Sequence, residues 1–428
     1  MRSTISFFLL LLSVSASAIT LEECRQRARE NYPLIRNVDL LRQTEEFTLS
    51  AVSKAWLPQV TVGAVATWQN HVAEYPEVLA QMIASRGIEM QGMRKDQYRA
   101  TVDVQQMVWD GGRISAKKRS ARMQTEEERL STEVDLYALE ERVDELFFSI
   151  VLLQEQRSAI ETTKTYVEAN LELLRSMLRN GVAMQCDVDA LEAEKVTLEQ
   201  QLLNVSSAEK SFKRVLSIYI NERECPQLEV GEFGVQDLPS PPQGGVRPEL
   251  SLFEAKQNSL SAQENEIRKG VMPTISAFGT AFYGYPGLNY MEAMMRHDWS
   301  FNLQVGLRLS WNISSLYTRK ALLNKVKTGK ERVDVMRDTF LFNNRLQASA
   351  QQDEVSRLQE IMATDSEIVR LRGRVRKAEE SKLREGTVNT TQLLDKITAE
   401  KNAIITANTH RIELLKAQTK LRHTLGVH

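Results

Sequence analysis

The chain has 428 residues, a formal net charge of -1, 42% hydrophobic residues and 26% charged residues. The near-zero charge excludes the strongly basic footprint of a nucleic-acid-binding protein, and the hydrophobic content excludes a chain that is disordered throughout. The sequence has no HExxH, GxSxG, P-loop or CxxC motif, so we predict that it is not an enzyme and that it uses no cofactor and no metal.

The first 18 residues have the pattern of a signal peptide. Arg2 precedes an apolar run at 7–12 that is too short to span a bilayer comfortably, and the small residues Ala16 and Ala18 form a small-x-small cleavage site. We predict cleavage after Ala18 and export through the inner membrane of a bacterium. An uncleaved N-terminal anchor helix is the alternative.

Three cysteines follow: Cys24, Cys186 and Cys225. Their spacing fits no metal site, and an odd number leaves at least one thiol unpaired within an exported chain. A Cys24–Cys225 bridge and three unpaired thiols are both compatible with the sequence.

The sequence contains the same order of elements twice. Residues 19–228 form a first repeat, the Pro- and Gly-rich stretch 229–245 is a linker, and residues 246–428 form a second repeat. Pro33 and Pro58 are as far apart as Pro248 and Pro273, and each pair encloses a helical stretch followed by alternating β-formers. We therefore expect one unit over 19–428 that arose by internal duplication.

Each repeat is predicted to consist of a helix, two strands, a very long helix, a turn and a last helix. The helix predicted at 113–179 would be about 100 Å long at 1.5 Å per residue. Its apolar seam follows a heptad and needs a partner of equal length, which the two shorter helices of the repeat can supply. The seam consists of Leu136, Leu139, Val143, Leu146, Ile150 and Leu153. Helices are expected at about 21–57, 113–179, 187–219, 249–271, 317–384 and 391–424, and strands at about 59–69, 98–109, 274–284 and 299–311.

The strand at 299–311 alternates strictly between apolar and polar residues. Its odd positions are apolar, and Asn302, Gln304, Arg308 and Ser310 lie on the other face. A soluble sheet packed on a core would give the same pattern. Four such strands behind an export signal, with no second β layer, favour a membrane barrel instead. Because closing a barrel takes about eight strands, other copies of the chain must complete it.

The duplicated order, the phrase VWDGGR at 108–113 and the phrases RNGVAMQCDVDAL and REGTVNTTQLLD together resemble the TolC-type outer-membrane efflux family. The resemblance implies a mainly α fold with a membrane β-barrel, in which a trimer combines four strands per protomer into a 12-stranded barrel above a long α-helical coiled-coil tunnel. It implies a passive exit duct for drugs, other small molecules or proteins, placed in the outer membrane and extending into the periplasm. The implied partners are outer-membrane lipid, a periplasmic adaptor and an inner-membrane pump of the RND or ABC type, with no nucleic acid.

The resemblance also assigns roles to the two turns between long and short helices. It places a pore gate at Gln392 and Asp395, and Asp187 and Asp189 are the acids that the first repeat offers instead. Only one of the two matched gate positions is acidic, and Val388 stands where some members have an arginine. Ordinary helix N-terminal acids are the alternative. The adaptor would dock on Gly181, Val182, Ala183, Gly386, Thr387 and Val388, although the glycines are also ordinary helix stops.

A periplasmic coiled-coil adaptor or scaffold without a pore is the rival interpretation. It would share the export signal and the long helices. It would normally have one helical hairpin on compact β domains, whereas this chain has two repeats that each place a strand pair before the long helix.

Overall fold

The computed structural model describes residues 18–87, 92–229 and 247–427. The predicted signal peptide lies outside these residues except for Ala18, and so does all of the predicted linker except Glu229. Among the described residues, the helices are α1 (Leu21–Asn31), α2 (Ile35–Ser53), η1 (Lys54–Trp56), α3 (Glu77–Ala84), α4 (Arg113–Arg179), α5 (Gln185–Ile220), α6 (Pro248–Gly270), α7 (Tyr290–Met295), α8 (Ser315–Arg384) and α9 (Thr390–Leu425). The strands are β1 (Gln59–Trp68), β2 (Asp96–Trp109), β3 (Thr274–Tyr285) and β4 (Ser300–Ser310).

The chain divides into two compact units. The strand unit comprises Asp39–Arg129 and Phe253–Val335, and the tip unit comprises Met1–Val38, Leu130–Leu252 and Met336–His428. Each unit contains segments of both repeats, so residues of both repeats form each unit. None of the described helices has the length and the apolar composition that a membrane span requires.

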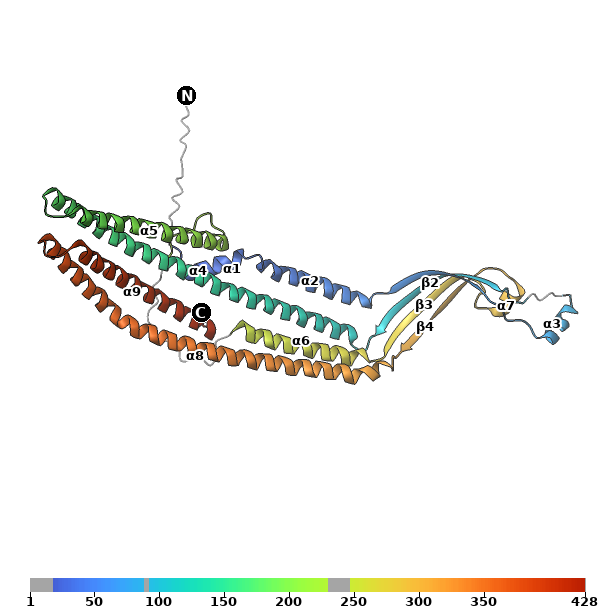
Figure 1. The fold of residues 1–428 in the computed structure, drawn as a ribbon. Helices are drawn as coiled ribbons and strands as arrows, with labels where there is room; N and C mark the ends of the chain where they lie inside the picture. Colours follow the sequence, from blue (N-terminus) through green and yellow to red (C-terminus); the bar gives the residue numbers. More distant parts are fainter. Residues whose placement is uncertain (1–17, 88–91, 230–246, 428) are drawn as a thin grey trace, which may run out of the picture. The chain divides into compact units, whose positions relative to one another are not determined.

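The tip unit is built from two helical hairpins. The α4 segment of this unit pairs with α5, and the α8 segment pairs with α9 (Figure 1). One buried cluster contains Val167 and Leu171 of α4, Leu191 of α5, and Leu383 and Leu393 of the second hairpin. The heptad seam predicted for α4 is buried at most of its positions, including Leu136, Leu139, Val143 and Ile150. Apolar burial between the hairpins therefore joins the two repeats.

The strand unit contains a four-stranded antiparallel sheet in the order β1-β2-β3-β4 (Figure 1). The central pair, β2 and β3, comes from different repeats, and its register joins Val102 to Ala281 and Val104 to Gly279. A mainly helical chain with four strands was predicted from the sequence, and this part of the prediction is confirmed.

The phrase VWDGGR forms the turn that starts α4. The Asp110 side chain accepts hydrogen bonds from the backbone N–H groups of Gly112 at 2.8 Å and Ile114 at 2.6 Å, which caps the helix. Gly111 has a φ of 69°, and a Cβ atom there would lie 2.5 Å from Cβ of Met272. Both the conformation and the close approach therefore require glycine at this position.

Replacing Gly111 with alanine should lower the free energy of unfolding by about 1–3 kcal/mol, because a left-handed residue is strained and Met272 must move. The measurement is the thermal or denaturant midpoint of the purified protein. The control is Gly270→Ala, since Gly270 lacks a positive φ and a Cβ there would have nothing within 4 Å. Equal midpoints for the two variants would contradict this account of the turn.

The single helix predicted at 21–57 was wrong. It divides into α1, α2 and the short η1, with Tyr32 at the end of α1 in an extended conformation at φ -65° and ψ 126°. The residue before a proline avoids the helical region, and Pro33 lacks a backbone N–H. The predicted helices at 113–179, 187–219, 249–271, 317–384 and 391–424 are confirmed to within a few residues. The short helices α3 and α7 were not predicted.

Candidate functional site

The strand register gives the sheet one apolar face. Cα partners place on it Val60, Val62, Ala64, Ala66, Trp68, Tyr98, Ala100, Val102, Val104, Ile275, Ala277, Gly279, Ala281, Tyr283, Phe301, Leu303, Val305, Leu307 and Leu309. We call this set the apolar sheet face. Gln106, next to the bulge at the end of β2, is a polar residue on the same side. The alternation predicted for 299–311 thus continues across all four strands.

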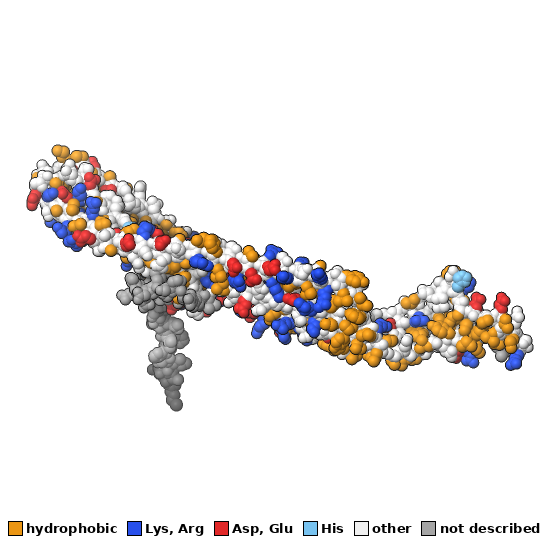
Figure 2. All heavy atoms as spheres, turned by 90° about the horizontal axis from the view of Figure 1, so that it is seen from below, with side chains coloured by type: hydrophobic (Ala, Val, Ile, Leu, Met, Phe, Trp, Pro, Cys, Tyr) orange, Lys and Arg blue, Asp and Glu red, His pale blue; other side chains and the backbone are white. Residues whose placement is uncertain are grey.

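The apolar sheet face is open along β4. Leu303 is 61% exposed, Val305 73% and Leu307 75%. In Figure 2, hydrophobic side chains gather over the strands, with few charged groups between them. An isolated exposed leucine is ordinary, but a contiguous exposed apolar patch of this kind marks a surface that contacts a membrane or another protein.

The opposite face is polar and its side chains contact one another across the strands. Thr280 donates a hydrogen bond to Asp103 at 2.6 Å, and Gln105 donates one to Ser276 at 3.1 Å. The guanidinium group of Arg99 lies 4.4 Å from the ring centre of Phe282 on this side. The polar side chains of the strand predicted at 299–311, including Gln304 and Arg308, lie on this polar sheet face.

The sheet has two open edges. Within the part of the chain that the structure describes, β1 pairs only with β2, and β4 pairs only with β3. Each edge presents backbone N–H and C=O groups that a further strand can pair with. The sheet is therefore a fragment that another chain can extend on both sides.

The turn between α4 and α5 and the turn between α8 and α9, which we call the tip turns, end their long helices in the same way. Gly181 and Gly386 have φ angles of 75° and 72°. After each glycine, the next N–H donates to a carbonyl of the last helical turn, from Val182 to Met177 at 2.9 Å and from Thr387 to Lys382 at 3.0 Å. These are glycine helix stops, as the alternative interpretation of both turns expected.

The predicted docking residues differ in exposure. Val182 is 67% exposed, and Gly181, Gly386 and Thr387 are also exposed. Ala183 and Val388 are partly buried against the tip-unit cluster that contains Leu191, Leu383 and Leu393. The structure therefore brings both turns to one hydrophobic core and leaves their glycine corners on the surface.

The predicted gate acids also differ in their surroundings. Asp187 accepts a hydrogen bond from the backbone N–H of Met184 at 3.2 Å, so it caps α5. Asp189 accepts one from the side chain of Gln185 at 2.7 Å. Asp395 is exposed, and its carboxylate has no hydrogen-bond or ion-pair partner among the described residues. The backbone N–H of Gln392 donates to Asn389 at 2.9 Å, while its side chain is exposed.

A buried charge network in the tip unit was missed by the sequence analysis. Arg376 of α8 is 5% exposed, pairs with Glu380 at 2.6 Å and hydrogen-bonds Glu400 of α9. Its guanidinium group lies 4.1 Å from the ring centre of Tyr166, and Asn170 donates to Glu380 at 3.2 Å. Burial opposes the charged form of Arg376, but the hydrogen bonds that Arg376 donates to Glu400 and Glu380, together with the negative charges of these carboxylates, outweigh it and raise the pKa of Arg376 above its ordinary value.

Comparison with known proteins supports the expected family resemblance. Residues 24–212 match the family described as "Outer membrane efflux protein". The comparison with curated proteins gives no significant match. The family match lies within the first repeat and includes the turn at Gly181.

Solved structures match almost the whole chain. The outer membrane protein VceC from Vibrio cholerae is 11% identical, with a TM-score of 0.67 over 95% of this chain and 96% of its own. The CmeC outer membrane channel of Campylobacter jejuni is 12% identical, with a TM-score of 0.68 over 95% and 85%. The MtrE outer membrane channel of Neisseria gonorrhoeae is 14% identical, with a TM-score of 0.67 over 95% and 89%. At these identities the likeness establishes a shared fold.

Proposed function

We propose that this chain is the exit duct of a tripartite efflux or secretion system. Its first repeat resembles the outer membrane efflux protein family, and its whole fold resembles outer membrane channels. The protein acts as a homotrimer in the bacterial outer membrane and extends into the periplasm. It is a passive conduit for drugs, other small molecules or proteins, and the energy for export comes from its inner-membrane partner.

The observation that carries this proposal is the four-stranded sheet with an open apolar face and two open edges. Three copies of four strands supply 12 strands, and pairing β4 of one protomer with β1 of the next satisfies both edges. The apolar sheet face then contacts lipid, and the polar sheet face lines the interior. Lipid-facing and interior-facing residues alternate in such barrels, as they do here.

Solute enters at the helical tips and leaves through the barrel. The tip residues Gly181, Val182, Ala183, Gly386, Thr387 and Val388 receive the periplasmic adaptor. The exposure of the glycine corners and of Val182 supports this role. Ala183 and Val388 are partly buried and have a supporting role, because they hold the two turns on one hydrophobic core.

Asp395 is the strongest candidate for the gate. It is exposed and unpartnered among the described residues, and three copies of it would form an acidic ring that favours cations. Asp189 and Gln392 would contribute polar groups at the same tips. Asp187 has the weaker claim, because its carboxylate already caps α5.

The adaptor interpretation is not supported by the comparisons, because the matched family and structures are described as efflux proteins and outer membrane proteins or channels. The same family description is one of transport, which agrees with the prediction that the chain is not an enzyme. As partners we propose outer-membrane lipid, a periplasmic adaptor and an RND- or ABC-type pump, with no nucleic acid.

The test is conductance in planar bilayers. The purified trimer should open as a cation-selective channel, and Asp395→Asn should move its reversal potential toward that of an unselective pore. The matched control is Glu331→Gln, an exposed acid on α8 in the strand unit, which should leave selectivity unchanged. A trimer that never conducts, even with Asp395 replaced and adaptor added, contradicts the proposal.

A further inference from the structure

Residues 19–31, which include helix α1, lie beside the last turn of α5 and the chain that follows it. Asn31 donates hydrogen bonds to the carbonyls of Ile218 at 3.0 Å and Tyr219 at 3.1 Å. Four residues earlier in α1, Arg27 pairs with Glu222 at 2.9 Å. Before the start of α1, Ile19 forms a parallel bridge with Leu228. In these three contacts, the earlier a residue lies in 19–31, the later its partner lies in 218–228.

Each of the two cysteines lies between the same two contacts that join these segments. Cys24 lies between Ile19 and Arg27, and Cys225 lies between Glu222 and Leu228. Cys24 is 0% exposed and belongs to one hydrophobic cluster, against which Cys225 packs. Burial raises the pKa of Cys24 to about 12, and the neighbouring Cys225 thiol acts in the same direction.

Backbone hydrogen bonds and a helix cap fix the two chain segments that carry these thiols. The backbone N–H of Ile19 donates to the carbonyl of Gln227 at 2.8 Å, and the N–H of Glu229 donates to the carbonyl of Ile19 at 3.0 Å. Thr20 and Glu23 form a capping box at the start of α1, which fixes the helical turn that carries Cys24. The two thiols are thus held in place by structure that does not depend on them.

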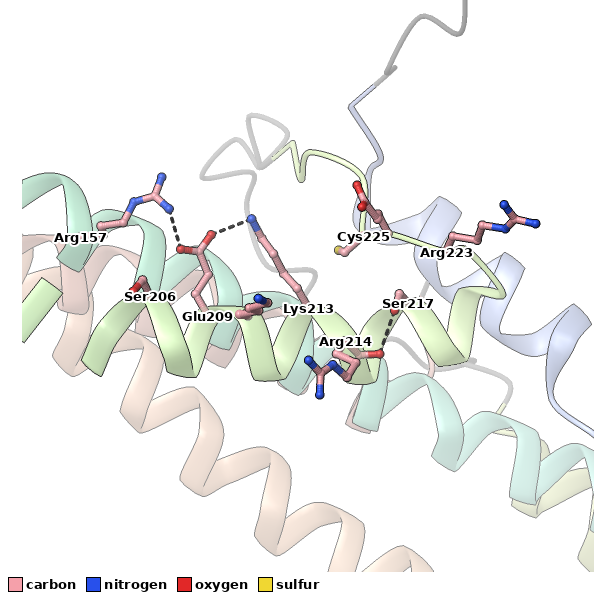
Figure 3. A pocket seen from close by; sticks show the side chains of 10 residues that line it. Arg157, Ser206, Glu209, Lys213, Arg214, Ser217, Arg223 and Cys225 are labelled. Carbon is pink, nitrogen blue, oxygen red and sulfur yellow. Dashed lines mark hydrogen bonds and ion pairs between the residues drawn. The ribbon is translucent and has the colours of Figure 1, made fainter. Parts of the chain in front are cut away.

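Cys225 is the accessible member of the pair. It lines a pocket of about 410 Å³ that lies along the last turns of α5 and the segment after this helix (Figure 3). Arg157 and Lys213 pair with Glu209 in the same pocket, at 2.8 Å and 2.6 Å. Burial raises the pKa of Cys225 above its ordinary value, and Lys213 acts in the opposite direction. Cys186 is remote from this pair in sequence and exposed at the start of α5.

We propose that Cys24 and Cys225 are joined by a disulfide in the exported protein, which fastens α1 to the segment after α5, and that Cys186 remains the free thiol. The structure holds all three as free thiols, so the bond is a covalent modification of the arrangement described above. The inference concerns the tip unit alone and does not depend on a pore.

The bond forms by exchange with a disulfide donor, either a small-molecule disulfide or a protein thiol oxidase. The Cys225 thiolate, which faces the pocket, attacks one donor sulfur and releases the other as a thiol. Cys24 then attacks the mixed disulfide at the sulfur of Cys225 and releases the second donor thiol. One S–S bond forms and one breaks, the two cysteine protons pass to the two donor sulfurs, and the donor is reduced by two electrons.

The experiment is thiol trapping of the protein isolated from membranes. The sample is denatured in N-ethylmaleimide without reductant and digested with trypsin. We expect a linked pair of peptides, one ending at Arg25 and one starting at Glu224, and alkylation of Cys186 alone. Reduction should release both peptides and lower the midpoint of thermal unfolding by roughly 5 °C or more, because the bond closes a very long loop.

Three variants make the test specific. Cys186→Ser should keep the linked peptides and the effect of reductant on unfolding. Cys24→Ser and Cys225→Ser should each abolish the link, and each should remove the effect of reductant. Alkylation of both Cys24 and Cys225 in the unreduced protein, after prior exposure to oxidised glutathione, overturns the proposal. A bond from either of them to Cys186 also overturns it.

Discussion

Replacing Arg376 with alanine is expected to lower the free energy of unfolding by about 3–5 kcal/mol, because the change leaves the buried carboxylate of Glu400 and the partly buried carboxylate of Glu380 without their cation. Glu400 is 8% exposed and hydrogen-bonds Arg376, and Glu380 pairs with the same guanidinium group at 2.6 Å. The loss exceeds that of a surface ion pair because no water can replace the missing charge. The measurement is denaturant unfolding of the purified protein.

Arg370→Ala is the matched control on the same helix. Arg370 pairs with Glu367 at 2.5 Å, but both side chains are more than half exposed, so the control should cost about 0–1 kcal/mol. The double variant Arg376→Met with Glu400→Leu should recover part of the loss, since it removes charges from both sides. Equal losses for Arg370→Ala and Arg376→Ala would show that the network is not buried as described.

Placing lysine at Val305 is expected to cost about 2–4 kcal/mol of folding in the membrane, which is the price of a cation on a lipid-facing strand near the bilayer midplane. Val305 is the middle residue of β4 and is 73% exposed on the apolar sheet face. In a water-exposed sheet the same change would be nearly neutral, because lysine would be solvated. The expected result is a sharp decrease in heat-resistant trimer in the outer-membrane fraction.

Gln304→Lys is the control for this prediction. Gln304 is the adjacent residue on the polar sheet face and pairs with Thr280 in the register. Its lysine would face the aqueous interior and should leave trimer yield close to that of the unchanged protein. If both lysines are tolerated equally, the apolar sheet face does not contact lipid.

The alternation at 299–311 predicted the most useful part of the structure. A period of two fixes which side chains share a face without knowledge of the neighbouring strands. The register then shows that Leu303 and Val305 continue a face formed by residues such as Val102 and Ala281. The helix ends were also predictable, because glycines such as Gly181 and Gly386 stop helices for local conformational reasons.

The features that escaped prediction depend on which segments become neighbours. Arg376 and Glu400 look like ordinary exposed charges in sequence, and only the packing of α8 on α9 buries them together. The order that matches Cys24 to Cys225 likewise depends on α1 lying along the chain after α5. Helix α7 had a readable local signal, since Asn289 caps it by accepting from the backbone N–H of Glu292.

The central claim is that separate copies of the chain close the sheet into a barrel, and cross-linking between edge strands tests it most directly. In a Cys186→Ser background, Thr61→Cys on β1 would be combined in turn with Asn302→Cys, Gln304→Cys and Arg308→Cys on β4, all on the polar sheet face. In outer membranes, oxidation should give covalent products of two and three chains at the matching register and nothing larger, because a three-membered ring is closed. A failure of every pair to link separate chains, or a ladder extending beyond three, would contradict the account.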